Sequence, residues 1–191
     1  MMLNNHMASS VILGIDYSMT CPAACVWSDT PQFWFAQQRR YTGLPAQLTH
    51  TEITTTEMLP RAEALATALM SWIEPYSITT IGIEDYAFAA TGRVFHIGEH
   101  TGILKYLLWK HPYRVQSIPP TVVKKFATGK GNADKPKMTA AFLADYPAAT
   151  AWIPLFFPRA TNREDAVIGK SPMADLADAY WLAKYTASLT R

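Results

Sequence analysis

The sequence predicts a mixed α/β fold, in which a five-stranded sheet of three antiparallel and then parallel strands is flanked by helices. Two observations carry this prediction. The first part of the chain holds three short β-rich apolar runs joined by short turns, and helical patterns alternate with strands after that. Hydrophobic residues make up 49% of the 191 residues and charged residues 17%, which is enough apolar surface for one sizeable core.

The three N-terminal runs are expected to form an antiparallel meander. They cover residues 10–17, 23–28 and 32–38. The turn signal Ser28-Asp29-Thr30-Pro31 separates the second run from the third. The next stretch, 39–56, is polar and rich in Thr, so we interpret it as a connection.

The middle of the chain alternates helix and strand. Leu65 and Leu69 lie one helical turn apart, and Pro75 ends that helical pattern. The predicted segments are a helix over 59–74, a strand over 79–85, a helix over 94–110 and a strand over 113–118. Strands that are separated by a helix in this way are typical of parallel pairing.

The C-terminal third is predicted to be mainly helical. Its segments are a helix over 120–127, a glycine-containing loop over 128–132, a helix over 135–146 and a last helix ending near Leu189. Ser171 and Pro172 are expected to supply the N-cap and first-turn proline of the last helix. The stretch 147–170 is predicted to be a loop insertion, either packed on the domain or forming a contact surface.

We expect a single domain over 1–191, because the sequence contains no linker, repeat or low-complexity tract. Residues 1–10 are expected to be a disordered start without the basic and apolar segments of a secretory signal. The apolar runs are well short of the roughly 20 residues that cross a bilayer. We therefore predict a cytoplasmic protein with no membrane partner. Cys21 and Cys25 are interpreted as buried free thiols.

Positive charge is concentrated in one block of the chain. Residues 105–137 hold eight basic side chains and a single acid, Asp134. Such a block favours an anionic polymer as partner, although most lysine runs are simply solvated helix faces. The candidate DNA contacts in the block are Lys124, Lys125, Lys130, Lys135 and Lys137.

Two predicted strands end in the same pattern of glycine, isoleucine and acid. The first strand contains Gly14-Ile15-Asp16, and the fourth contains Gly82-Ile83-Glu84. Because residues two apart share a face of a strand, each acid follows a position without a side chain on its own face. An ionised acid in a central strand is costly unless it is paired or bound to a metal.

Two further acids, Asp175 and Asp178, lie three residues apart on the last helix and therefore share a face. A carboxylate in a first helical turn is explained by the helix dipole alone, but that explanation does not cover Asp178 and both strand acids. Four convergent carboxylates indicate a site for hard divalent cations, Mg²⁺ or Mn²⁺.

With these residues in place, the chain over 11–187 resembles the RuvC-type Holliday-junction resolvases of the ribonuclease H-like superfamily. The resemblance consists of five segments in family order: Ile12-Leu13-Gly14-Ile15-Asp16; Ile83-Glu84; Ile97-Gly98-Glu99-His100-Thr101-Gly102; the stretch from Pro120-Thr121-Val122-Val123-Lys124-Lys125 through Gly129-Lys130-Gly131 to Lys135; and Ala174-Asp175-Leu176-Ala177-Asp178-Ala179.

The resemblance implies a ribonuclease H-like fold and a metal-dependent endonuclease that resolves Holliday junctions or branched DNA by symmetric phosphodiester hydrolysis. It implies that Asp16, Glu84, Asp175 and Asp178 form the catalytic, metal-binding set and hold two Mg²⁺ or Mn²⁺ ions. It also implies that Lys130 and Lys135 hold backbone phosphates.

The family acts as two-fold dimers, so the resemblance also implies a homodimer. The helix over 94–109, with Gly98 and Gly102, looks like the family's dimer helix, although the glycines are equally compatible with close packing on the sheet. Tyr86 and Phe88 stand where the family places an aromatic wedge against junction bases.

The chain departs from the family pattern after Asp16, and the stretch 147–170 has no clear counterpart. Compact, divergent resolvases of this kind resemble those of bacteriophages. Two other functions remain open: another ribonuclease H-like nuclease, acting on RNA–DNA hybrids or on branched DNA in general, and a non-catalytic DNA-binding module.

Overall fold

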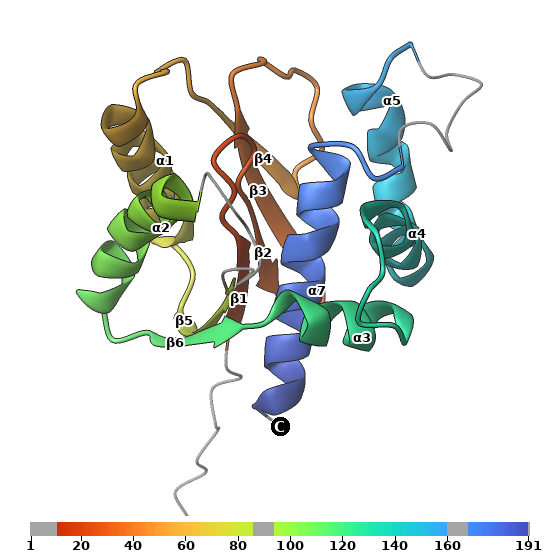
Figure 1. Ribbon diagram of the computed structural model, residues 1–191. Helices are drawn as coiled ribbons and strands as arrows, with labels where there is room; N and C mark the ends of the chain where they lie inside the picture. The colour runs from red at the N-terminus through yellow and green to blue at the C-terminus, as the bar shows by residue number, and fades with distance from the viewer. Residues whose placement is uncertain (1–10, 86–93, 160–167, 191) are drawn as a thin grey trace, which may run out of the picture.

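The computed structural model describes residues 11–85, 94–159 and 168–190, and its central feature is one mixed sheet with helices on both faces (Figure 1). The strands are β1 (Val11–Asp16), β2 (Ala23–Trp27), β3 (Gln32–Gln37), β4 (Leu48–Glu52), β5 (Ile78–Glu84) and β6 (Arg114–Ile118). Their order across the sheet is β4-β3-β2-β1-β5-β6. Strands β1 to β3 pair antiparallel, and β5 and β6 add in parallel beside β1. The predicted mixed α/β architecture is therefore confirmed.

The sheet has six strands instead of the predicted five, because β4 forms within the stretch that we interpreted as a connection. This strand pairs in parallel with β3 at the edge of the sheet. Only Leu48 of its five residues is buried, so its sequence lacks the apolar alternation that marks the other strands. Thr51 accepts a hydrogen bond of 2.9 Å from the indole of Trp34, which ties this polar strand to its neighbour.

Helices α1 (Met58–Ile73) and α2 (Val94–Trp109) cover one face of the sheet. The other face carries α7 (Met173–Leu189), with α3 (Pro120–Thr128) and α4 (Lys135–Asp145) packed against it (Figure 1). Each face has its own buried apolar cluster. No helix in the described ranges is long and apolar enough to cross a membrane.

Alternation along β1 decides which side chains reach α7. Leu13 and Ile15 pack into the cluster beneath α1 and α2, so Gly14 and Asp16 lie on the opposite face, toward α7. A Cβ atom on Gly14 would lie 2.2 Å from the backbone nitrogen of Ala183. A Cβ on Gly82 would lie 2.0 Å from the hydroxyl of Thr186. The two glycines thus allow α7 to approach β1 and β5 closely.

The first part of the expected loop insertion is helical. A 3₁₀ helix, η1 (Pro147–Trp152), continues into the short α5 (Ile153–Phe156). Trp152 and Phe156 are buried in the cluster on the α7 face, where Phe156 meets Phe35 edge to face with ring centroids 5.5 Å apart. The apolar run 152–157 is therefore packed on the domain, which was one of the two expectations for this stretch. The expected start 1–10 lies outside the described residues.

Candidate active site

Asp16 and Glu84 lie side by side at the carboxyl ends of two neighbouring parallel strands. The register of β1 and β5 pairs Gly14 with Gly82 and Ile15 with Ile83. The next residue of each strand is the acid, so the two acids lie together at the end of the sheet where β1 and β5 finish. Asp16 is 7% exposed, and Glu84 is half-buried. The repeated pattern of glycine, isoleucine and acid therefore has a structural meaning. The glycine lets α7 approach the strand, and the acid two residues later lies at the strand end beside that helix.

Asp175 and Asp178, in the first turns of α7, lie at the same end of the sheet as Asp16 and Glu84. The helix passes Gly14 at Ala179 and Ala183, and the charges of Asp175 and Asp178 act on Asp16, so its first turns lie toward the end of β1 at which Asp16 stands. Asp175 is buried, with 2% of its surface exposed, and Asp178 is partly buried. We call Asp16, Glu84, Asp175 and Asp178 the acidic cluster.

The carboxylates of the acidic cluster influence one another's protonation. Burial, reinforced by the charge of Glu84, raises the pKa of Asp16 well above its usual value. Burial also raises the pKa of Glu84, against the opposing charges of Lys124 and Lys135. In Asp178, burial and the charge of Glu84 raise the pKa to about 7. Burial and the mutual repulsion of the carboxylates therefore oppose ionisation of this site.

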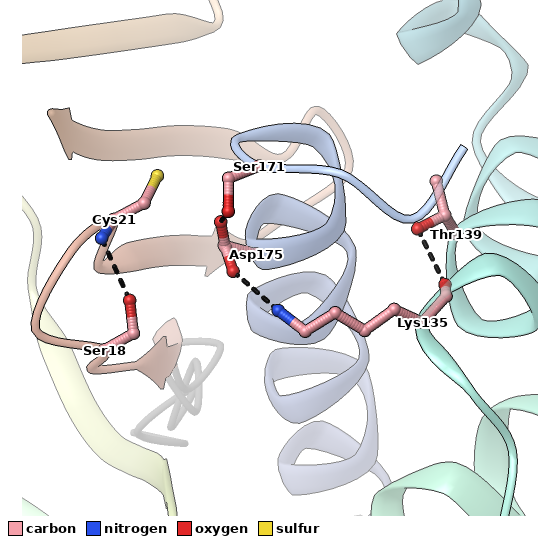
Figure 2. A network of polar contacts seen from close by, with 6 residues as sticks. All are labelled: Ser18, Cys21, Lys135, Thr139, Ser171 and Asp175. Carbon is pink, nitrogen blue, oxygen red and sulfur yellow. Dashed lines mark hydrogen bonds and ion pairs between the residues drawn. The ribbon is translucent and has the colours of Figure 1, made fainter. Parts of the chain in front are cut away.

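One cation bonds directly to the acidic cluster. The ammonium of Lys135, at the start of α4, lies 3.0 Å from a carboxylate oxygen of Asp175 (Figure 2). Partial burial acts to lower the pKa of Lys135, but the charges of Asp175 and Asp16 outweigh it and raise that pKa above its usual value. The predicted phosphate contact Lys135 is thus also a counter-charge for the acids.

A neutral hydroxyl also bonds to Asp175, and a neutral thiol lies close enough to be affected by its charge. The hydroxyl of Ser171 donates to its second carboxylate oxygen (Figure 2). Burial, together with the charge of Asp175 and a hydrogen bond to it, raises the pKa of the Cys21 thiol. The backbone N–H of Cys21 donates to the hydroxyl of Ser18 at 3.0 Å, which fixes the turn after β1.

Sequence reasoning missed both of these contacts. We expected Ser171 to cap the last helix, but the structure has no side-chain cap at that helix start, and Ser171 bonds to Asp175 instead. Its position four residues before Asp175 was the available signal. Cys21 is a buried free thiol, as predicted, but no sequence pattern indicated its contact with Asp175.

The donor set of the acidic cluster fits a hard divalent cation in its chemistry. All four groups offer carboxylate oxygens, which Mg²⁺ and Mn²⁺ prefer. As the side chains stand, no three His, Cys, Asp or Glu residues of the described part of the chain converge closely enough to hold one ion. The Lys135 ammonium beside Asp175 balances part of the charge that a cation would otherwise balance.

The remaining predicted DNA contacts differ in their distance from the acids. Lys124 lies close enough for its charge to act on Glu84 and Asp178. Lys125 and Lys130 are exposed, and Lys137 is exposed and paired with Asp134 at 3.0 Å. The last two predicted site residues, Tyr86 and Phe88, lie outside the described residues.

Comparison with known proteins identifies the fold. No protein-family model matches the chain, and no curated protein matches it in sequence. Thermus thermophilus RuvC superposes with a TM-score of 0.55 at 13% identity over 94% of this chain and 96% of that one. The structure of T. thermophilus RuvC in complex with a Holliday junction substrate also has a TM-score of 0.55 at 13% identity, over 91% and 90% of the two chains.

A third match is the yeast mitochondrial Holliday junction resolvase Ydc2, with a TM-score of 0.50 at 15% identity over 95% of this chain and 83% of that one. The chain therefore has the ribonuclease H-like fold of these resolvases, as the resemblance in the sequence implies. At identities of 13–15% the likeness establishes the fold, and the activity has to be argued from the site.

Proposed function

We propose that this chain is a metal-dependent, structure-selective endonuclease that resolves Holliday junctions and branched DNA by hydrolysing phosphodiester bonds symmetrically. The observation that carries the proposal is the acidic cluster: β1, β5 and α7 bring four buried or partly buried carboxylates to one end of the sheet, where burial and their mutual repulsion oppose ionisation. A module that only binds DNA gains nothing from this arrangement, because buried carboxylates repel phosphates and cost folding free energy.

The acidic cluster would hold Mg²⁺ or Mn²⁺, and we propose two ions per site. Bound divalent ions supply an activated water and stabilise the leaving oxygen in an in-line attack on phosphorus. Ser171 and Lys135 orient the two oxygens of Asp175. Lys135 also offers a positive charge for a phosphate that approaches the acids, once Asp175 is shared with an ion.

The basic residues of α3, the following loop and α4 would hold the DNA backbone beside the site. Lys124 is within electrostatic reach of the acidic cluster, whereas Lys125, Lys130 and Lys137 face solvent. Such contacts to phosphates fix the register of the substrate and not its sequence. Tyr86 and Phe88 stand two and four residues after Glu84 in the chain, and we propose that one of them stacks on a junction base.

A homodimer would suit a junction of two-fold symmetry, and α2 offers a surface for it. Phe95, Gly102 and Trp109 recur every seven residues and lie exposed; Phe95 is 82% and Trp109 77% exposed. A Cβ on Gly98 or Gly102 would meet nothing within 4 Å, so these glycines do not serve close packing on the sheet. We call Phe95, Gly98, Gly102, Tyr106 and Trp109 the α2 stripe.

The proposal is tested by offering the purified protein three labelled substrates: a four-way junction, a linear duplex of matched sequence and an RNA–DNA hybrid, each with Mg²⁺, Mn²⁺ or EDTA. Paired symmetric nicks in the junction alone, lost in EDTA, are expected. Cutting of the hybrid alone would instead indicate a ribonuclease, and an absence of cutting would indicate a binding module.

Two substitutions sharpen the test. Asp16→Asn and Asp178→Asn should abolish cleavage while the protein still binds the junction, because they remove ion ligands without removing basic residues. The matched control is Asp29→Asn, which neutralises an exposed acid in the turn between β2 and β3, at the opposite end of the strands. Normal cutting by either cluster variant would show that its residue is not part of the metal site.

A further inference from the structure

The N-terminal half of the protein carries few basic residues, and the described ones lie at one end of the sheet, where β1 and β3 finish. Between residues 11 and 85 the basic side chains are Arg39, Arg40 and Arg61. The first two follow the end of β3, and the third lies in the first turn of α1. Because β1 and β3 both pair antiparallel with β2, they run in the same direction. The end of β3 therefore lies at the same end of the sheet as the acidic cluster.

A pocket of about 410 Å³ opens at this end of the sheet, and every side chain that lines it has a hydrogen-bond donor. Its lining residues are Thr20, Gln37, Gln38, Arg39, Thr56 and Arg61. No acidic side chain contributes to the lining. Two guanidinium groups with amide and hydroxyl donors form a chemistry suited to an anion with several oxygens.

Arg61 is held rigidly in the pocket wall. Its guanidinium donates to the carbonyl oxygens of Met19 at 3.1 Å and of Thr55 at 3.1 Å, with further bonds to Thr20 and Ile53. These carbonyls come from the turn after β1 and from the segment that leads into α1. The arginine is therefore pre-organised, and its positive charge remains because carbonyl groups are neutral.

Arg39 is the second arginine of the wall. It donates to the carbonyl oxygen of Phe156 at 3.2 Å and lies 5.0 Å above the ring of Tyr41. Within the described residues, neither Arg39 nor Arg61 forms an ion pair. The two charges are thus anchored by neutral partners. Four of the five N–H groups of Arg61 are used by the carbonyls, so Arg61 offers an anionic ligand its charge and one remaining N–H, whereas Arg39 also offers several free donors.

The distance to the acidic cluster is limited by the chain. Thr20 lies four residues after Asp16, so their α-carbons are at most about 14 Å apart. Successive phosphates of one DNA strand advance about 3.4 Å along the helix axis. A strand whose scissile phosphate lies at the acidic cluster, and which runs toward Thr20, therefore comes to the Thr20 side of this pocket within about four nucleotides.

We propose that the pocket between Arg39 and Arg61 binds a backbone phosphate of the DNA strand that the acidic cluster cuts, a few nucleotides from the scissile bond. This inference rests on the proposed function. It adds a phosphate subsite that shares no residue with the lysine block and is built from the end of β3, the turn after β1 and the start of α1.

The test measures binding of a labelled four-way junction in EDTA, so that no cleavage interferes. Gln38→Glu places a negative charge in the lining at an exposed position, and we expect it to weaken binding about tenfold. Its matched control is Thr30→Glu, which adds the same charge to the exposed turn between β2 and β3, at the opposite end of the strands. Equal affinities for the two variants would overturn the proposal.

A second pair of variants removes charge instead of adding it. Arg39→Ala should weaken binding and reduce the slope of log affinity against log salt by about 0.9, the value for one lost phosphate contact. Arg40→Ala removes the neighbouring exposed charge, which does not line the pocket, and should change both quantities less. Circular dichroism of each variant confirms folding.

The outcome for the subsite is separable from that for the nuclease. If the wild-type protein cuts junctions while Arg39→Ala and Arg40→Ala bind alike, the subsite is wrong and the nuclease remains. If the wild-type protein cuts no substrate while Arg39→Ala and Gln38→Glu still lose affinity selectively, the phosphate subsite is supported and the nuclease is not.

Discussion

Asp178 holds a carboxyl whose ionisation the fold opposes, since burial and the charge of Glu84 raise its pKa to about 7. In the unfolded chain the same group has a pKa near 3.8. Between these values the folded state binds more protons than the unfolded state, so the free energy of unfolding falls as pH rises through this window. This contribution applies to the metal-free protein.

We therefore expect Asp178→Asn to stabilise the metal-free protein at pH 8 and not at pH 4. At pH 8 the rise in melting temperature should be at least about 2–4 °C, the shift that 1 kcal/mol produces in a chain of this size. Thermal unfolding in EDTA at both pH values measures it. The exposed control Asp29→Asn should show no such difference, and a wild-type stability that rises from pH 4 to 7 in step with the variant's would contradict the assignment.

Ser171 is a positioning residue, because it bonds to Asp175 and would not itself touch an ion or DNA. Its removal leaves one oxygen of a buried carboxylate without its partner. Ser171→Ala should raise the Mg²⁺ concentration needed for half-maximal cleavage about tenfold, whereas Ser171→Thr, which keeps the hydroxyl, should restore it. Metal titrations of the cleavage rate test this, and a change in maximal rate alone would indicate another role.

Among the elements, the contact of β1 with α7 depends on Gly14. A Cβ there would lie 2.2 Å and 2.4 Å from backbone atoms of Ala183 and Ala179, which cannot move aside as a flexible side chain can. Since α7 also carries Asp175 and Asp178, any shift of this helix separates them from Asp16.

Gly14→Ala should therefore cost about 3 kcal/mol of unfolding free energy and reduce cleavage at the same time. Gly102→Ala is the matched control for stability alone, since it belongs to the α2 stripe: a Cβ there meets nothing within 4 Å, and alanine favours a helix by about 1 kcal/mol. Urea unfolding at low protein concentration compares the two variants. Similar stability for both would show that the close approach of β1 and α7 is not required.

The elements that sequence reasoning missed share a physical cause. Strand β4 forms because the edge of β3 offers unpaired backbone groups, and its own residues Thr49, His50 and Thr51 give no apolar signal. The helical turns of η1 and α5 contain two prolines and an apolar run, and they form where Trp152 and Phe156 pack against Phe33 and Phe35. Both depend on neighbours distant in the sequence.

For the whole molecule, assembly depends on the α2 stripe. Its aromatic residues lie on the side of α2 away from Leu104 and Leu108, which are buried against the protein's own core. Tyr106 and Trp109 stack with ring centroids 6.3 Å apart and leave an exposed apolar surface.

We expect the protein to sediment at twice the chain mass of 21.3 kDa, and Trp109→Ala to raise the dissociation constant of the dimer at least tenfold. Leu189→Ala is the control, since Leu189 is an exposed apolar residue at the far end of α7, 51% exposed. Analytical ultracentrifugation over a concentration series measures the constants. A monomeric wild-type protein, or equal effects of the two variants, would contradict a dimer through α2.

The sequence by itself determined the order of strands and helices from Val11 to Leu189, apart from β4, η1 and α5, and it determined which four acids to expect in one place. These features follow from local periodicity and from the repeated glycine–isoleucine–acid pattern, which each segment carries on its own. The resemblance carried by the five quoted segments, and not the periodicity, implied the fold that the solved resolvase structures share.

Only the tertiary structure decided which groups surround those acids. Lys135 and Asp175 are 40 residues apart, and Arg61 bonds to Thr20 across 41 residues, so no local pattern encodes either contact. Such pairs form because α4 and α7 pack together and because α1 begins beside the turn after β1. The partners of Asp175 and the arginine-lined pocket therefore exist only once the sheet and its helices have assembled.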